Sequence, residues 1–120
     1  MTENEFNDEL ELLTPEEAAT RVLDGALLID VRPADHREEK AIGAVLVNRY
    51  EMEKQFIPGA ENFVAEAGNP ERPIVVMCGS VKGSAPMAQW LKENGYTNVS
   101  HVEGGFAGWK DAGLPVDKVD

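Results

Sequence analysis

The segment that decides the fold is PIVVMCGSVKGS, residues 73–84. Residues 74–77 form an unbroken apolar run of β-forming side chains, which is typical of a strand covered on both faces in a parallel sheet. A short loop follows, and we place the N-cap of the next helix at Ser84. The apolar side chains beyond it recur at helical spacing: Met87, Ala88, Trp90 and Leu91. The segment therefore predicts strand, loop and helix in succession, with Cys78 at the end of the strand.

The chain on either side of this segment continues the alternation of helices and strands. Thr14, Pro15 and Glu17 read as the N-cap, first-turn proline and capping-box glutamate of a helix that Gly25 closes. Apolar runs predict further strands, and helical spacing predicts further helices. The strands cover residues 26–31, 45–47 and 99–102, and the helices cover residues 50–57, 60–67 and 106–112. This pattern indicates an α/β fold with a mainly parallel central sheet.

Length and cysteine content bound the organisation of the chain. Its 120 residues predict a single domain over residues 12–120, preceded by a mobile acidic arm over residues 1–11. One cysteine excludes an internal disulfide and a thiolate cluster for structural zinc, which favours a reducing compartment. The N-terminal residues lack the basic and apolar regions of a signal peptide, and no apolar run approaches the ~20 residues that span a bilayer. We therefore expect a cytoplasmic protein with no membrane partner.

The charge balance limits the classes of ligand. Acidic residues number 22 against 11 basic ones, for a formal net charge of -11. Such a surface repels nucleic-acid phosphates and anionic lipids, so we expect neither as a partner. A small anionic substrate would also be repelled until it met a local cationic or amide-lined pocket.

Cys78 is the candidate reactive group, because ligands in open parallel sheets bind beyond the carboxyl ends of the strands. A helix N-terminus directly after the cysteine favours the thiolate form and presents free N–H groups to an anion. Lys82 would add positive charge near the sulfur. Gly79 and Gly83 lack β-carbons, so the loop amides can turn inward around a small anion.

Four pieces of the sequence resemble the rhodanese family, in the family's order and with its separations. They are Leu28-Ile29-Asp30-Val31-Arg32, Gly43-Ala44, the strand 74–77 that ends in Cys78, and Val102-Glu103-Gly104-Gly105-Phe106-Ala107-Gly108-Trp109. They match, in turn, the family's Asp-x-Arg strand end, its Gly-Ala turn, its nucleophile strand and its Gly-Gly-aromatic-x-x-Trp signature. The resemblance covers residues 14–116. It implies a three-layer fold in which helices cover both faces of the central sheet.

The resemblance also implies a chemistry, which is sulfur transfer. Cys78 would attack the outer sulfur of a small anionic donor, become a persulfide, and yield that sulfur to a thiol, to cyanide or to an acceptor protein. The implied substrate-binding loop consists of Gly79, Ser80, Val81, Lys82, Gly83 and Ser84. The supporting residues are Asp30 and Arg32, which we expect to brace neighbouring loops, and Arg49, for which a place in the pocket and a place on the surface are both open. We expect no metal and no cofactor.

Three departures from the family leave the donor open between thiosulfate and 3-mercaptopyruvate. The family's loop arginine is replaced by Gly83, with Lys82 one place earlier. The opening Cys78-Gly79-Ser80 resembles mercaptopyruvate sulfurtransferases more than the Cys-Arg start of many thiosulfate enzymes. The turn usually written Gly-His-Ile-x-Gly-Ala is one residue short here, and Ala41 stands in place of the histidine.

Two other functions compete with this interpretation. A phosphatase or arsenate reductase would share a thiolate in an anion-binding loop, but its Cys-x5-Arg pattern fails because Ser84 occupies the arginine position. The stronger rival is a rhodanese-like module of low activity that binds a protein partner or carries sulfur for it. The retained Cys78 argues against an inactive module. His36 and His101 show no metal-ligand spacing, and we expect both to be ordinary surface or partly buried histidines.

Overall fold

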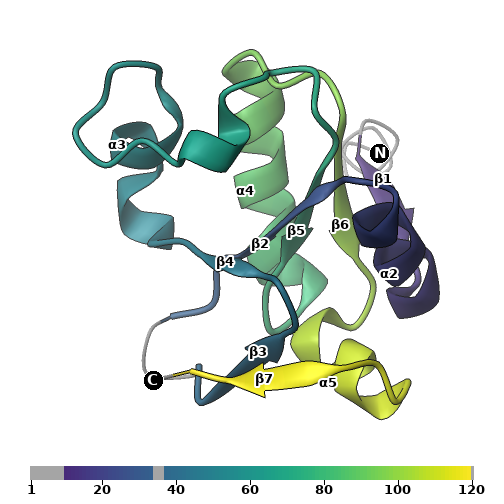
Figure 1. The fold of residues 1–120 in the computed structure, drawn as a ribbon. Coiled ribbons are helices and arrows are strands. Elements are labelled where there is room, and N and C mark those ends of the chain that lie inside the picture. The colour runs from purple at the N-terminus through teal and green to yellow at the C-terminus, as the bar shows by residue number, and fades with distance from the viewer. Residues whose placement is uncertain (1–9, 34–36, 120) are drawn as a thin grey trace.

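A five-stranded parallel sheet forms the centre of the protein (Figure 1). The computed structural model describes residues 10–33 and 37–119. The strands are β1 (Glu11–Leu13), β2 (Leu27–Asp30), β4 (Val45–Leu46), β5 (Ile74–Met77) and β6 (Val99–Val102), in the spatial order β1-β6-β5-β2-β4. A separate antiparallel pair joins β3 (Glu39–Ala41) to β7 (Val116–Lys118), which brings the C-terminal strand beside the middle of the chain.

Helices cover both faces of the sheet. The α-helices are α2 (Pro15–Leu23), α3 (Met52–Phe56), α4 (Val81–Glu93) and α5 (Gly105–Asp111), and the short 3-10 helices are η2 (Arg49–Glu51) and η3 (Ala65–Ala67). α3 and α4 pack on one face, where Phe56 and Leu91 meet Ile29 and Val76. α2 and α5 cover the other face through the second core cluster, which contains Trp109. The predicted α/β fold with a mainly parallel sheet between two helical layers is therefore confirmed.

Local sequence signals explain the first helix in full. Thr14 caps α2, because its side chain accepts a hydrogen bond from the Glu17 N–H at 3.1 Å while the Glu17 carboxylate accepts one from the Thr14 N–H at 2.9 Å. Pro15 occupies the first turn, where a missing N–H costs little. The predicted capping box is confirmed.

Two predictions about secondary structure are wrong. The helix expected over residues 60–67 is absent: within that range the structure has only the three-residue η3, and the rest is turn and loop. Backbone bonds such as Val64 N–H to the Gln55 carbonyl fold this stretch back on α3 instead of winding it. The strands β1, β3 and β7 were not expected, because each has only three residues and pairs with a segment distant in sequence.

The proposed arm at residues 1–11 is only partly within the described chain. Residues 1–9 lie outside it. Leu10 is buried at 3% exposure in the core, and Glu11 begins β1, so the last two residues of the expected arm belong to the folded domain. In the part of the chain that the structure describes, no helix combines the length and the apolar character needed to cross a bilayer.

Candidate functional site

The candidate site lies where neighbouring parallel strands end. β5, β2 and β4 are adjacent in the sheet, and Asp30 at the end of β2 pairs with Met77 at the end of β5. Cys78 therefore leaves the sheet beside Asp30. Arg49 comes shortly after β4, the strand that is the neighbour of β2. This edge is where open α/β sheets bind ligands.

The connection between β5 and α4 is shorter than the sequence suggests. α4 begins at Val81 with Ser80 as its N-cap, so the N-cap placement at Ser84 is wrong. The backbone of Ser80 is extended, and its carbonyl accepts hydrogen bonds from the N–H groups of Gly83 and Ser84 at 3.1 and 3.2 Å. The helix thus starts directly after Ser80. Only residues 78–80 form the loop, and the rest of the expected loop is the first turn of α4.

The first turn of α4 offers hydrogen-bond donors to an anion. Cys78 lies three positions before the first residue of the helix, and the residue is 4% exposed. The N–H groups of residues 79–82 donate to no other residue within the described ranges. A helix end of this kind combines free donors with the positive end of the helix dipole. Such a site stabilises negative charge on the sulfur and on a bound anion.

Arg49 is the cation that contacts the sulfur. Its Nη1 lies 3.8 Å from the Sγ of Cys78, within hydrogen-bond distance for sulfur. Lys82 lines the same cavity with an exposed side chain. Arg49 reaches the site because Asn48 caps η2 by accepting the N–H of Tyr50 at 2.9 Å, which fixes the turn that carries the arginine. Of the two alternatives open for Arg49, the structure places it in the pocket.

Gly83 leaves the space that the sulfur occupies. A β-carbon at this position would lie 2.4 Å from the Cys78 Sγ and 3.6 Å from the Arg49 Nη1. Real β-carbons essentially never approach another heavy atom so closely. The absence of an arginine at position 83 therefore has a local reason: any side chain there would displace the sulfur, and the cation comes from Arg49.

The Gly104-Gly105 pair, at the start of α5, packs against the backbone of Cys78 and Gly79. Gly105 has a φ of +59°, and a β-carbon on it would lie 2.3 Å from the Cys78 carbonyl oxygen. That same oxygen accepts a hydrogen bond from the Phe106 N–H at 2.8 Å. The start of α5 is therefore pressed against the backbone of the candidate nucleophile, which fixes the direction in which Cys78 leaves β5.

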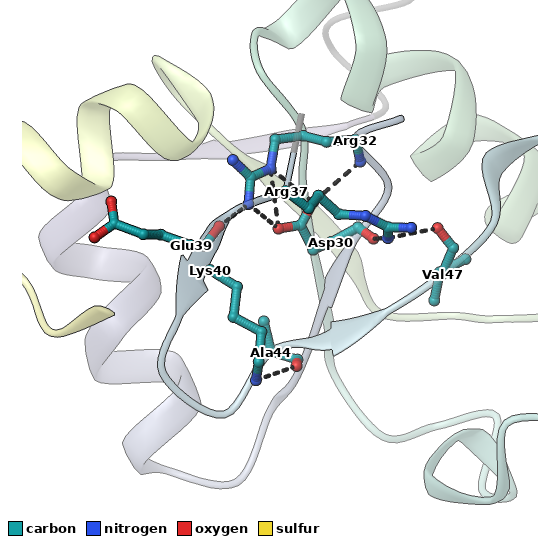
Figure 2. Close-up of polar contacts among 7 residues, drawn as sticks. All are labelled: Asp30, Arg32, Arg37, Glu39, Lys40, Ala44 and Val47. Atoms are coloured by element: carbon teal, nitrogen blue, oxygen red, sulfur yellow. Dashed lines mark hydrogen bonds and ion pairs between the residues drawn. The ribbon is translucent and has the colours of Figure 1, made fainter. Parts of the chain in front are cut away.

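Asp30 and Arg32 form a buried ion pair (Figure 2), and Arg32 also lines the cavity at Cys78. The Arg32 Nη2 lies 2.7 Å from the Asp30 Oδ2, and neither side chain is more than 8% exposed. Arg32 also donates to the Glu39 carbonyl of β3 and stacks over the Phe106 ring, with its Cζ 4.1 Å from the centroid. The pair ties β2, β3 and α5 together, as expected for a brace between loops.

Ser84 points away from the cavity. It is fully buried, and its Oγ lies 2.9 Å from the Nδ1 of His101 on β6. Burial lowers the pKa of His101 below its ordinary value, which favours the neutral ring. The expectation of a surface or partly buried His101 is therefore wrong, since only 3% of the residue is exposed. Ser84 locks the first turn of α4 onto the sheet and does not line the cavity.

The cavity at Cys78 has a volume of about 640 Å³ and opens to solvent. It is lined by Arg32, Pro33, Arg49, Cys78, Gly79, Ser80, Lys82, Gly83, Phe106 and Ala107. Sequence reasoning did not assign Pro33, Phe106 or Ala107 to the site. The signal for Phe106 was its place directly after Gly104-Gly105, while nothing in the sequence singled out Pro33. Within the described residues, no three His, Cys, Asp or Glu side chains gather as metal ligands.

Comparison with known proteins gives consistent matches. The family model described as the rhodanese-like domain matches residues 14–112. The thiosulfate sulfurtransferase GlpE of Actinobacillus succinogenes is 35% identical over 108 residues, which cover 88% of each chain. The thiosulfate sulfurtransferase GlpE of Haemophilus influenzae is 30% identical over 105 residues, covering 88% of this chain and 92% of the relative.

Solved structures share the fold. A Rhodopseudomonas palustris protein of unknown function, described as a possible tyrosine phosphatase, has a TM-score of 0.83 at 27% identity, covering 95% of this chain and 89% of its own. The polysulfide-sulfur transferase of Wolinella succinogenes has a TM-score of 0.71 at 24% identity, covering 98% of this chain and 85% of its own. The second match, at this low identity, supports the fold alone.

Proposed function

The chain belongs to the rhodanese-like domain family, and we propose that it is a sulfurtransferase that carries sulfur as a persulfide on Cys78. Similarity to thiosulfate sulfurtransferases along most of the chain supports sulfurtransferase activity broadly. The observation that carries the Cys78 assignment is its geometry. A cysteine at a strand end has its Sγ 3.8 Å from a guanidinium nitrogen, beside free helix N–H groups, in an open cavity.

The first half-reaction loads the sulfur. The Cys78 thiolate attacks the outer sulfur of thiosulfate, or the one sulfur of 3-mercaptopyruvate, so an Sγ–S bond forms. With thiosulfate, the S–S bond of the donor breaks and sulfite leaves with the electron pair. With 3-mercaptopyruvate, the C–S bond breaks, and the departing carbon takes up a proton to give pyruvate. Arg49 and the first-turn N–H groups of α4 hold the anionic donor and the thiolate close together.

The second half-reaction unloads it. A thiolate or cyanide attacks the outer sulfur of the persulfide, forms a bond to that sulfur and breaks the Sγ–S bond. Cys78 leaves as the thiolate, ready for the next donor. The acceptor we propose is a thiol on a small molecule or a protein, in the cytoplasm, where the single cysteine stays free of disulfides.

Phosphate-ester hydrolysis is less well supported. The position at which a Cys-x5-Arg phosphatase needs its arginine holds Ser84, which is buried and bonded to His101. An arginine side chain there would have to replace a residue packed between α4 and β6.

Thiocyanate formation tests the proposal. Purified protein with thiosulfate and cyanide, and separately with 3-mercaptopyruvate and cyanide, should give thiocyanate above the uncatalysed rate with at least one donor. Cys78→Ser should reduce both rates to background. No thiocyanate from either donor would reject the enzyme and favour the low-activity module that acts through a protein partner.

A further inference from the structure

A buried hydrogen bond joins the first turn of α4 to the sheet. The Ser84 Oγ lies 2.9 Å from the Nδ1 of His101 on β6, and the two residues are 0% and 3% exposed. Neither residue lines the cavity at Cys78. The two half-reactions of sulfur transfer therefore use neither side chain directly.

The surroundings of this pair are apolar. His101 is in register with Leu12 of β1 and Val76 of β5, and Ala88 and Leu91 of α4 pack into the core on the same side of the sheet as Val76. A polar pair adds little net stability in such a place, because apolar side chains of the same shape could replace both partners at little cost. A hydrogen bond differs from apolar contacts in having a fixed direction and distance. The pair therefore fixes the position of α4 along β6.

The usual means of fixing a first turn is missing at α4. An N-cap side chain normally accepts a hydrogen bond from an N–H group two or three positions later. Within the described chain, Ser80 makes no such bond, although its backbone has the extended form of an N-cap. The N–H groups of the turn stay free for an anion, so the turn has to be held in another way. Ser84 holds it, because its N–H donates to the Ser80 carbonyl while its hydroxyl contacts His101.

The position of Ser84 also fixes the residue that lies against the sulfur. Gly83 directly precedes Ser84, and a β-carbon on Gly83 would stand 2.4 Å from the Cys78 Sγ and 3.6 Å from the Arg49 Nη1. The backbone of Gly83 is therefore packed against the reacting atom. A small shift of Ser84 would move Gly83 and change the surroundings of the sulfur.

We propose that His101 is a positioning residue for the reaction at Cys78, and that it acts through Ser84 to hold the first turn of α4 against the sulfur. The inference rests on the proposed sulfurtransferase function and adds to it a residue of β6 that lies outside the cavity. Burial lowers the pKa of His101 below its ordinary value, so the ring brings no charge into the core at neutral pH.

The test uses two substitutions of the same shape. Asparagine and leucine both branch at the γ-carbon, and asparagine carries polar atoms the same number of bonds from the backbone as the His101 Nδ1. His101→Asn can therefore keep a hydrogen bond to Ser84, and His101→Leu cannot. Loading by thiosulfate, followed by intact-mass spectrometry, should slow about tenfold in His101→Leu and stay within about threefold of the wild-type rate in His101→Asn. Equal rates in the two variants would overturn the proposal.

Ser84→Ala removes the same contact from its other partner and should slow loading about as much as His101→Leu. The matched control is Ser100→Ala. Ser100 is also a buried serine, and its hydroxyl donates to the Ile74 carbonyl of β5 at 3.5 Å. Ser100→Ala should load sulfur at the wild-type rate. An equal loss in the two serine variants would show a general effect of removing a buried hydroxyl and would reject the positioning role.

The double variant Ser84→Ala/His101→Leu tests whether the two residues act as a pair. It should load no more slowly than either single variant, because each single change already removes the contact. Losses that multiply would show independent effects and reject the proposal. Each variant is assayed at a temperature at which urea unfolding shows it fully folded, so lost stability alone does not slow the reaction. If His101→Leu does not fold, the comparison of Ser84→Ala with Ser100→Ala decides.

Alkylation of Cys78 by iodoacetamide keeps this test apart from the proposed function, because it needs no sulfur transfer. If the protein takes up sulfur from no donor, the proposed function fails, and alkylation rates at one pH decide on His101. A rate about threefold lower in His101→Leu and Ser84→Ala, and kept in His101→Asn and Ser100→Ala, supports the positioning role, because displaced N–H groups stabilise the thiolate less. The same rate in all four variants rejects it.

Discussion

A β-carbon at Gly83 would stand 2.4 Å from the sulfur of Cys78, so the candidate nucleophile occupies the space that a side chain at position 83 would need. This lack of space explains two departures from the usual rhodanese loop. The arginine expected at position 83 is missing, and the cation beside the sulfur arrives from Arg49, which lies 29 positions before Cys78.

The first prediction concerns this contact. Gly83→Ala should force the Cys78 sulfur away from Arg49 and slow persulfide formation by about a hundredfold, since a misplacement near 1 Å can have an effect of that size. Gly79→Ala is the matched control, because a β-carbon there meets nothing within 4 Å. Stopped reactions with thiosulfate, read by intact mass, measure both rates. Equal rates for the two variants would contradict the role given to Gly83.

The second prediction compares the two candidate cations. Arg49→Gln should lower the second-order rate of loading by thiosulfate about tenfold or more, because the contact to the sulfur is direct. Lys82→Gln should lower it about twofold to threefold, because an exposed ammonium is screened by water and salt. The roles would be reversed if Lys82→Gln had the larger effect.

The third prediction tests how α5 supports the loop. Gly105→Ala places a β-carbon 2.3 Å from the Cys78 carbonyl oxygen at a positive φ, and should lower the free energy of unfolding by about 2–4 kcal/mol. Gly113→Ala has a similar φ of +77° with nothing within 4 Å, and should lower it by about 1 kcal/mol. Urea unfolding distinguishes them. Similar losses would mean that backbone strain alone, without the clash at Cys78, sets the requirement for glycine.

The fourth prediction concerns pH. Burial lowers the pKa of His101 from its ordinary value of 6.5, so below that pH the unfolded chain takes up a proton that the folded protein resists. The stability due to the neutral ring is complete above pH 6.5 and is lost as pH falls toward the lowered pKa. His101→Gln should therefore flatten the fall in stability over that range.

His36→Gln controls for the other histidine of the chain. Urea unfolding curves at several pH values give the slope of stability against pH. An unchanged slope in His101→Gln would show that the ring is not held neutral.

The sequence was sufficient where local signals decide the structure. The capping box at Thr14 and the apolar strand before Cys78 act through neighbouring residues, and both predictions are confirmed. The start of α4 was placed at Ser84 and not after Ser80, because Ser84 looks like a cap in isolation. Its hydroxyl is instead committed to His101, 17 positions later, which no local pattern reveals.

The candidate site shows the same contrast between what local sequence predicts and what depends on residues distant in sequence. The apolar strand directly before Cys78 predicts that this residue lies at a strand end. The contact with Arg49, in contrast, depends on β4, β2 and β5 being neighbours in the sheet. That strand order is a tertiary property. The short strands β1, β3 and β7 were missed for the same reason, since three-residue edge strands are defined by their partners and not by a repeating pattern.

The central claim is that Cys78 carries the sulfur, and one measurement tests it most directly. Wild-type protein and Cys78→Ser are incubated with thiosulfate, freed of small molecules and examined by intact-mass spectrometry without reductant. The account predicts a gain of one sulfur atom in the wild-type protein, reversed by a thiol, and no gain in Cys78→Ser. An unchanged mass of the wild-type protein after thiosulfate, or the same gain in Cys78→Ser, would contradict it.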